Sequence, residues 1–267
     1  MFVMVDTPDT NSYLYNARSE LTSATAAVDS AYRYGYNFDD IGNRRSSLER
    51  RAQSAEYTAN NLNQYTDMTS QTSQTSQTFQ TSFDADGNQT LVKTSIGIWS
   101  VTYNGENRPI LWAQGTNTIS MTYDRMGRRV TKNDQRFVYN GYLCIKKIDD
   151  SATAHSSLLP DHYFIGDPTE PVATRPLAWQ RGTSVAYYTH DGNKNVSEVI
   201  ASNNDVAAHY EYAPFGALTV SRGVSDAANP WRFLSEYAED DTATVYCNYR
   251  HYEPVTGRGF KGQSLLT

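Results

Sequence analysis

The residues of this chain that could bind metal lack the spacing that metal binding needs. Asp84, Asp86 and Asn88 match the first three ligand positions of a calcium loop. The sixth position is Gln89 and the twelfth is Ser95, where such a loop needs glycine and glutamate. The five histidines form no HxH or HxxxH pair. The sequence therefore predicts no metal, no cofactor and a hairpin turn around Asp84.

Nucleophilic chemistry has equally little support. Cys144 and Cys247 are the two cysteines, they lie far apart, and no CxxC pair occurs. They could form one disulfide bond, but two half-buried thiols are the preferred interpretation. The sequence contains no GxSxG motif and no Walker phosphate loop. No residue is therefore predicted to be catalytic.

Composition excludes further classes. The chain has 267 residues and a formal net charge of -6, which disfavours binding to a phosphate backbone, so nucleic acid is not an expected partner. No stretch approaches the roughly 18 apolar residues of a membrane-spanning helix. The opening Met1–Val5 run is followed at once by Asp6 and is too short for a signal-peptide core. The sequence therefore predicts no membrane span and shows no signal peptide.

The elements that hold the polar residues come from an internal repeat. Each unit has an aromatic residue, three further residues and a glycine, usually with Asp or Asn beside the aromatic and Asn or Arg after the glycine. The glycines recur at intervals near multiples of about 22 residues. The residues that define the units are Phe38, Asp39, Gly42, Asn43, Phe83, Asp84, Gly87, Asn88, Tyr123, Asp124, Gly127, Tyr188, Gly192, Asn193, Tyr212 and Gly216.

Each unit has the chemistry of a β-hairpin. Glycine accepts positive φ, and the side chain of Asp or Asn caps the bend. The flanking residues are β-formers in partial alternation, as in Trp99–Tyr103 and Ala208–Tyr212. One hairpin is only marginally stable, so the sequence predicts hairpins that pair laterally into one curved, all-β sheet. The period-three tract Thr69–Gln77 has no apolar face, which predicts a solvated loop or a polar outer strand.

From residue 185 onward the motifs follow a more specific order. They are Tyr187–Asn193, Val196–Ile200, Tyr210–Gly216, Asn229–Phe233 and Tyr249–Arg258. This series resembles the RHS repeat-associated core domain, and the earlier units look like its YD repeats. The residues that match the end motif of the family are Arg250, Tyr252, Glu253, Pro254, Gly257 and Arg258.

The resemblance implies a division of the chain. We expect a lead-in over 1–30, a YD-hairpin array over 31–150 with the polar tract at 69–77, and a proline-containing connection over 151–184. A partial core domain over 185–260 and a tail over 261–267 follow. We place the boundary between the two blocks near residues 150–180, because four prolines cluster there.

The resemblance also implies a spiralling sheet that closes into a hollow shell, with the core domain plugging one end. In many bacterial members the core is an aspartyl autoprotease that releases a C-terminal toxin held inside. This sequence departs from that pattern: Glu253–Pro254 replaces the family's Asp-Pro, and no aspartate follows Asp241. An aspartyl mechanism needs two carboxylates. Self-cleavage is therefore not expected, and the chain is interpreted as truncated, with only nine residues after Arg258.

The expected function is structural. The chain would be a non-catalytic part of an RHS shell that encloses or presents a polypeptide, in a bacterial polymorphic-toxin or cell-surface system that is secreted or displayed. One alternative is an aspartyl autoprotease core that releases a C-terminal toxin. Another is a surface adhesion module whose exposed tyrosines stack on glycans.

Overall fold

The computed structural model describes residues 10–29, 31–50, 53–150, 161–170, 175–225, 228–247 and 249–260. Contacts divide the chain into two compact units, Met1–Ser82 and Phe83–Thr267. Both units consist of antiparallel strands joined by short turns, so the predicted all-β class with its hairpin sheet is confirmed.

The first unit is one seven-stranded sheet whose strands pair in chain order. Its strands are β1 (Asn11–Tyr15), β2 (Leu21–Ala26), β3 (Arg33–Phe38), β4 (Arg44–Glu49), β5 (Gln53–Ala59), β6 (Tyr65–Gln71) and β7 (Ser76–Gln80). A guanidinium lies at the centre of its buried face: Arg44 stands over the ring of Tyr36, with 4.6 Å between the guanidinium carbon and the ring centroid. Rings of this kind attract a desolvated cation.

The polar tract Thr69–Gln77 forms part of this sheet. It covers the end of β6, a turn and the start of β7, and the hydroxyls of Thr69 and Thr78 lie 2.9 Å apart across the two strands. Its side chains are exposed apart from a few half-buried ones. Of the two states that the sequence predicts for the tract, the structure has the polar outer strand.

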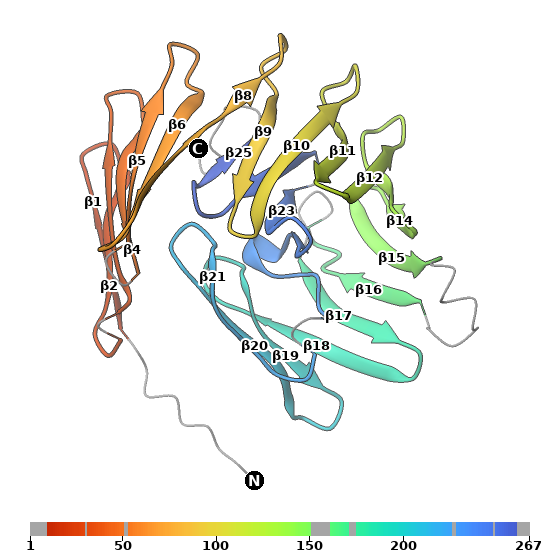
Figure 1. Cartoon of the computed structure of the whole chain (residues 1–267). Helices are drawn as coiled ribbons and strands as arrows, with labels where there is room; N and C mark the ends of the chain where they lie inside the picture. The colour runs from red at the N-terminus through yellow and green to blue at the C-terminus, as the bar shows by residue number, and fades with distance from the viewer. Residues whose placement is uncertain are drawn as a thin grey trace. The chain divides into compact units, whose positions relative to one another are not determined.

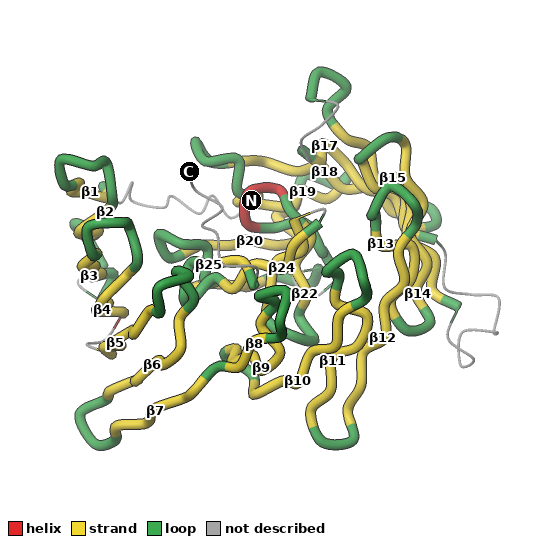
Figure 2. The backbone as a smooth tube through the Cα atoms, turned by 90° about the horizontal axis from the view of Figure 1, so that it is seen from above, coloured by secondary structure: helices red, strands yellow, loops and turns green. Residues whose placement is uncertain are grey.

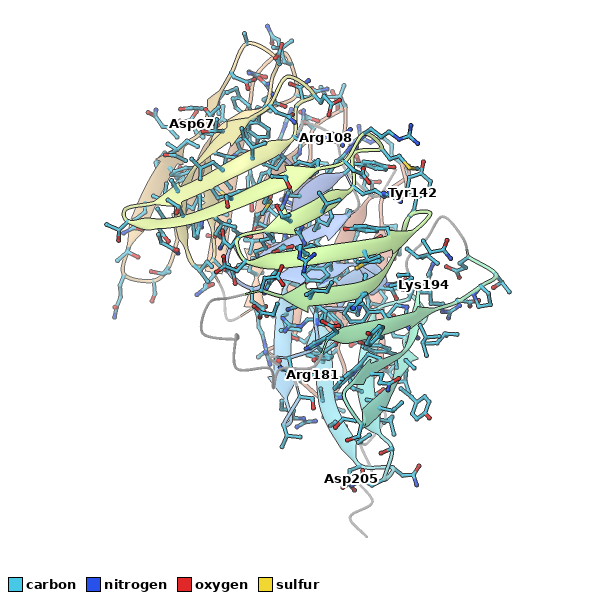
Figure 3. The ribbon with its side chains drawn as sticks, turned by 90° about the vertical axis from the view of Figure 1, so that its right-hand side faces the viewer. Asp67, Arg108, Tyr142, Arg181, Lys194 and Asp205 are labelled. Carbon is cyan, nitrogen blue, oxygen red and sulfur yellow. The ribbon has the colours of Figure 1, made fainter. Side chains whose placement is uncertain are left out.

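The second unit holds a fourteen-stranded sheet in unbroken chain order. Its strands are β8 (Ser82–Phe83), β9 (Gln89–Thr94), β10 (Gly97–Tyr103), β11 (Pro109–Gln114), β12 (Asn117–Tyr123), β13 (Arg129–Lys132), β14 (Gln135–Asn140), β15 (Leu143–Asp149), β16 (His162–Gly166), β17 (Pro176–Arg181), β18 (Ser184–His190), β19 (Val196–Ala201), β20 (Val206–Tyr212) and β21 (Leu218–Arg222). Turn residues such as Arg108, Tyr142 and Lys194 lie at the ends of the strands, on the same side of this sheet (Figure 3).

A second, four-stranded sheet packs against one face of the large sheet, which we call the inner face. It follows the short 3-10 turn η3 (Phe233–Ser235) and consists of β22 (Tyr237–Glu239), β23 (Thr244–Cys247), β24 (Arg250–Glu253) and β25 (Arg258–Gly259). The strands from β10 to β19 curve around it (Figures 1 and 2). Tyr237 and Tyr246 of the small sheet share one buried cluster with Phe137, Phe164 and Trp231. Phe260 joins a second cluster with residues of β9 to β12.

The repeat turns have one geometry, seen at Asp124. The Asp124 N–H donates to the Arg128 carbonyl over 3.0 Å, and the Gly127 N–H donates back to the Asp124 carbonyl over 2.9 Å. The Asp124 carboxylate accepts the N–H groups of Met126 and Arg128 over 2.9 and 3.0 Å. Gly127 has φ +83°, and the strand register shifts by one residue beside the turn. The turn therefore ends in a β-bulge that contains the left-handed glycine, and the Asp124 carboxylate caps the N–H groups of the turn.

The same side-chain cap is present at six other turns. Its acceptors there are Asn16, Asp39, Asn60, Asp84, Asn104 and Asp191. The units at Asn16 and Asn60 contain no glycine, because Ser19 and Asn63 take the left-handed position. The glycine spacing therefore could not reveal them.

The structure corrects the alignment of one unit. The capping residue of the turn after β18 is Asp191, and the left-handed position four residues into the turn is Lys194 with φ 65°, not Gly192. The side-chain amide that bonds the Asp191 carboxylate belongs to Asn195 rather than Asn193. His190 thus occupies the aromatic position. Tyr188 lies two residues earlier on the inner face, where its hydroxyl bonds Asn229 over 2.9 Å.

In the unit at Tyr212 the predicted glycine does occupy the left-handed position, but the turn has no side-chain cap. Gly216 is left-handed with φ 91°, and the turn begins at Ala213, which has no side-chain acceptor. The close packing of the turn compensates, because the ring of Phe233 lies directly over Gly216 and would meet any added Cβ.

In several units a tyrosine hydroxyl forms a hydrogen bond to the backbone of the preceding unit. The hydroxyl of a tyrosine near the end of one strand donates a hydrogen bond to the backbone carbonyl of the first residue after the preceding repeat turn. The pairs are Tyr103 to Gln89 (2.9 Å), Tyr123 to Pro109 (2.8 Å), Tyr139 to Arg129 (2.9 Å) and Tyr212 to Val196 (2.8 Å). Phenylalanine could fill the same space but could not donate, which explains why the repeat uses tyrosine at these positions.

Within the range 151–184 that the sequence predicts as a connection, the described residues form β16 and β17. These strands pair with β15 and β18 and continue the large sheet. The segments 151–160 and 171–174 lie outside the described residues, as do residues 1–9 and 30 of the lead-in 1–30 and the tail 261–267. The described strands of 185–222 also belong to the large sheet, so the separate small sheet begins only at Tyr237.

Candidate functional site: the buried contact between the two sheets of the second unit

The small sheet is anchored to the inner face by buried charges. Glu239 of β22 is fully buried and forms ion pairs with Arg129 and Lys132 of β13, both of which are also buried. Lys132 makes a second ion pair with Asp241, whose carboxylate oxygen lies 2.8 Å from the ammonium. Burial alone would raise the pKa of Glu239, but the two cations outweigh burial and lower that pKa to about 2. Glu239 is therefore ionised at neutral pH.

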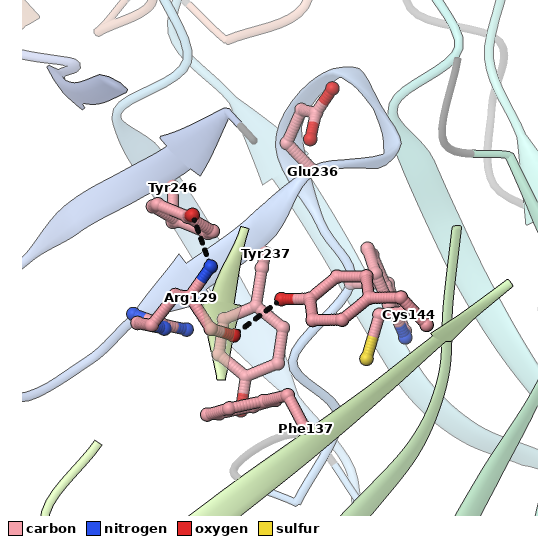
Figure 4. A pocket seen from close by; sticks show the side chains of 8 residues that line it. Arg129, Phe137, Cys144, Glu236, Tyr237 and Tyr246 are labelled. Carbon is pink, nitrogen blue, oxygen red and sulfur yellow. Dashed lines mark hydrogen bonds between the residues drawn. The ribbon is translucent and has the colours of Figure 1, made fainter. Parts of the chain in front are cut away.

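The guanidinium of Arg129 lies among three aromatic rings. Its carbon is 4.3 Å from the ring centroid of Tyr246, 4.7 Å from that of Phe137 and 5.3 Å from that of Tyr237. The backbone of Arg129 is held as well, because the Tyr246 hydroxyl accepts its N–H over 3.1 Å and Tyr139 donates to its carbonyl (Figure 4). Each ring face stabilises the buried cation.

A small cavity lies beside this cation and is lined by Cys144, Glu236 and Trp231 in addition to the rings (Figure 4). Its volume is about 10 Å³, which is the room that one water molecule needs. Burial raises the pKa of the Cys144 thiol to about 12. A protonated thiol is a poor nucleophile, and the cavity has no space for a substrate.

A buried histidine lies on the other side of the ion pairs. His251 of β24 has its ring centroid 5.2 Å from that of Trp112 and 5.3 Å from that of Tyr246, and its Nδ1 lies 3.2 Å from the Thr244 hydroxyl. Burial lowers the pKa of His251 to about 3, so the ring is neutral at pH 7. This ring packs as an aromatic residue rather than as a charged group.

The predicted end motif forms the last hairpin of the small sheet. Tyr252 is buried, and its hydroxyl donates to the Phe215 carbonyl over 2.8 Å. The Glu253 carboxylate accepts the N–H groups of Val255 and Thr256 over 3.1 and 2.5 Å, and Gly257 is left-handed with φ 71°. Glu253 thus caps a turn as Asp124 does in the repeat.

The remaining members of the motif complete this hairpin. Pro254 lies in the turn, and Arg258 faces Glu253 in the register of β24 and β25. Arg250 begins β24 opposite Cys247. The structure therefore brings the six motif residues together as one turn and its two flanking strands.

No cluster of three or more His, Cys, Asp or Glu side chains within the described ranges has the geometry to hold a metal ion. In the same part of the chain, no helix has the length and apolar character required to cross a membrane.

Sequence reasoning missed the central members of this site. Arg129, Lys132 and Glu239 belong to no motif, and Lys132 and Glu239 are separated by 107 positions. One local signal exists: Glu239 stands two residues after Tyr237, on the side of β22 that faces the core. A carboxylate at a core-facing strand position is unusual unless a cation meets it.

Comparisons with known proteins find relatives in sequence and in structure. No protein-family model matches the chain. The chain is 26% identical over 190 residues to double-stranded DNA deaminase toxin A of Burkholderia cenocepacia, covering 59% of this chain and 13% of that protein. It is 21% identical over 237 residues to the tRNA3(Ser)-specific nuclease WapA of Bacillus spizizenii, covering 83% of this chain and 9% of that protein. The chain thus spans only a small part of either relative.

The solved structures show the fold. The crystal structure of TcdB2-TccC3 matches 95% of this chain with a TM-score of 0.61 at 14% identity, over 16% of its own length. A Photorhabdus luminescens Tc holotoxin pore matches 95% of this chain with a TM-score of 0.59 at 15% identity, over 15% of its own length. The open antiparallel sheets of this chain therefore have the fold of a Tc-toxin segment, and these matches support an RHS-like shell fold.

Proposed function

We propose that this chain is a non-catalytic wall segment of a toxin-related shell and that its inner face encloses a neighbouring polypeptide. The observation that carries the proposal is the construction of the large sheet. Fourteen strands follow one another in chain order, and tyrosine hydroxyls bond successive units. A sheet of this kind grows by repetition into a curved wall with one inward face. The similarity to a DNA deaminase toxin and the Tc-toxin fold support this role.

The chemistry of the small sheet supports a non-catalytic role. The carboxylates that an aspartyl mechanism would need are already engaged: Glu239 and Asp241 pair with cations, and Glu253 caps a turn. Asp240, the fourth carboxylate of this segment, lies 2.6 Å from Arg232. A shared proton between two neighbouring carboxylates, which activates water in aspartyl proteases, has no counterpart among these pairs.

The experiment attaches a flexible tail of Gly, Ser and Lys to the end of the chain after Thr267 and follows its digestion by trypsin. The control carries the same tail ahead of Met1. We expect the C-terminal tail to be cut about tenfold more slowly, because an enclosed tail is cut only when the wall opens. Equal rates would refute enclosure. Spontaneous cleavage of the undigested fusion, mapped by mass spectrometry to the chain itself, would refute the non-catalytic role.

A further inference from the structure

A row of three nitrogen-bearing side chains crosses the inner face beside the small sheet. Lys147 of β15 pairs in register with His162 of β16, and His162 pairs with Arg181 of β17. Lys147 is also the register partner of Phe137, whose buried ring packs against Tyr237 at 5.6 Å. Directly paired residues project from the same face of a sheet, so this row lies on the inner face. Arg181 lies at the end of its strand (Figure 3).

The row places two cations, Lys147 and Arg181, at half-buried positions on either side of His162. Burial lowers the pKa of Lys147, and the neighbouring Lys132 and Arg181 lower it further. The ring of His162 stacks on Trp179 with 6.1 Å between centroids and 15° between planes. Burial, assisted by Lys147 and Arg181, lowers the pKa of His162 to about 4. Burial of an ammonium without an ion pair is unfavourable, so the half-buried Lys147 has a cost that folding alone does not explain.

The cations of the row differ from other cations of the unit. Within the ranges that the structure describes, the Lys147 ammonium and the Arg181 guanidinium make no ion pair or hydrogen bond, although Asp149 acts on Lys147 electrostatically. The neighbouring Lys146 points to the opposite face and has both a carboxylate and an aromatic ring as partners. Its ammonium lies 2.6 Å from Asp161 and 5.0 Å from the ring centroid of Tyr163.

We propose that Lys147, His162 and Arg181 bind an acidic segment of the enclosed polypeptide, through its carboxylates. This inference rests on the proposed function, which supplies the polypeptide. Three adjacent strands span roughly 10 Å, and alternate side chains of an extended segment lie roughly 7 Å apart, so two carboxylates of one segment reach the outer two members of the row. A guanidinium and an ammonium with open donors are suited to carboxylates.

The surroundings favour a polypeptide over a nucleic acid. The net charge of the chain is -6, and the carboxylates of Asp149, Asp161 and Glu239 act electrostatically on Lys147 or His162. A short acidic segment can place its charges on the row alone, whereas a phosphate backbone would carry charge past these carboxylates.

The test measures the binding of a fluorescein-labelled (Gly-Glu)₆ peptide by anisotropy at low salt. We expect binding that weakens as salt is added, and no binding of the matched (Gly-Gln)₆ peptide. Lys147→Gln and Arg181→Gln should each weaken binding about tenfold or more, because each removes hydrogen bonds to a charged group. Lys146→Gln, one residue away on the outer face, should leave binding unchanged.

Stability separates a binding role from a structural one. If the row exists to bind carboxylates, Lys147→Gln should raise the melting temperature while it weakens peptide binding, because the mutation removes the cost of burying the Lys147 ammonium. A lower melting temperature with unchanged binding would assign Lys147 a packing role and overturn the proposal.

Three other outcomes overturn the proposal. They are binding of (Gly-Gln)₆ as tight as that of (Gly-Glu)₆, a loss of peptide binding in Lys146→Gln as large as in Lys147→Gln, and binding of a single-stranded DNA of equal charge that is tighter than binding of (Gly-Glu)₆. The trypsin digestion tests the proposed function separately. A tail that trypsin cuts freely, with peptide binding intact, refutes enclosure. A protected tail without peptide binding refutes only the row.

Discussion

Glu239 shows how one residue can join two sheets. It is a carboxylate with no exposed side-chain surface, and Arg129 and Lys132 supply its charge partners. A buried ion pair adds little net stability compared with apolar packing, but removing one partner is costly because the other charge stays buried. The contact therefore fixes which part of the inner face the small sheet covers.

Glu239→Gln should destabilise the second unit by about 3–5 kcal/mol, because it leaves Arg129 buried without a compensating charge and Lys132 with only the exposed Asp241 as a partner. Urea unfolding followed by tryptophan fluorescence measures this effect, since the four tryptophans, Trp99, Trp112, Trp179 and Trp231, all belong to that unit. The matched control is Asp150→Asn, which removes an exposed pair with Arg136 and should cost less than about 1 kcal/mol. Equal effects of the two mutations would contradict this account.

At this scale the sequence has limited predictive power. It identified Asp39, Asp84 and Asp124 as turn caps, because the partners of each cap lie within four residues. It could not identify Glu239, because both of its partners lie more than a hundred positions away and carry no motif. The end motif was recognisable, but the turn-capping role of Glu253 is a property of its three-dimensional contacts.

The repeat turn is the element on which the sheets depend. It needs a left-handed residue at one position, and the chain fills that position with glycine, asparagine, serine or lysine. Asn and Gly tolerate that backbone at little cost, whereas most L residues do not. This tolerance explains both the recognisable glycine repeat and the units at Asn16 and Asn60 that escape it.

Gly127→Ala should destabilise the second unit by about 1–2 kcal/mol, because φ +83° is unfavourable for a residue with a Cβ. The added Cβ would also lie 1.8 Å from a terminal nitrogen of Arg108, so that flexible side chain must move. Gly105→Ala is the matched control, since its Cβ would meet nothing within 4 Å and its φ is not left-handed. Thermal unfolding of the two variants compares them directly. A similar loss for both would show that glycine is not needed for its conformation.

At the scale of the whole molecule, buried histidines make stability depend on pH. Burial lowers the folded-state pKa of His251 to about 3 and that of His162 to about 4, whereas an unfolded histidine titrates near 6.5. The unfolded chain therefore binds more protons below pH 6.5, and stability is lost as pH falls through that value. The stabilising effect of Glu239, whose pKa is about 2, is lost only below about pH 4.5.

Between pH 6.5 and 4.5 the free energy of unfolding of the second unit should fall by about 1.4 kcal/mol per pH unit for each of these two histidines. Urea titrations at several pH values, again read from tryptophan fluorescence, measure the slope. His251→Phe keeps an aromatic ring in the space and should reduce the slope by about 1.4 kcal/mol per pH unit, the contribution of one histidine. An unchanged slope in that variant would show that His251 does not titrate in this range.

The fold class was predictable because alternation, turn residues and a repeat of about 22 residues all indicate paired hairpins. The division into units was harder to predict. The strand pairing of β15 to β18 runs through the proline-containing range 151–184, because a proline is tolerated at the start of β17, where Pro176 faces Gly166 across a register shift. The small sheet has no repeat of its own, so its position depended on contacts that no local pattern encodes.

The hydrogen bonds between successive units and the buried ion pairs also imply an order of events during synthesis. Every strand of the large sheet pairs with its neighbours in sequence, so each hairpin can form soon after it leaves the ribosome and can lock to the hairpin already made. Glu239 reaches Arg129 only after more than a hundred further residues have emerged. Until then Arg129 and Phe137 on the inner face lack their cover from Tyr237 and Tyr246 of the small sheet. The large sheet can therefore form before its inner face is covered.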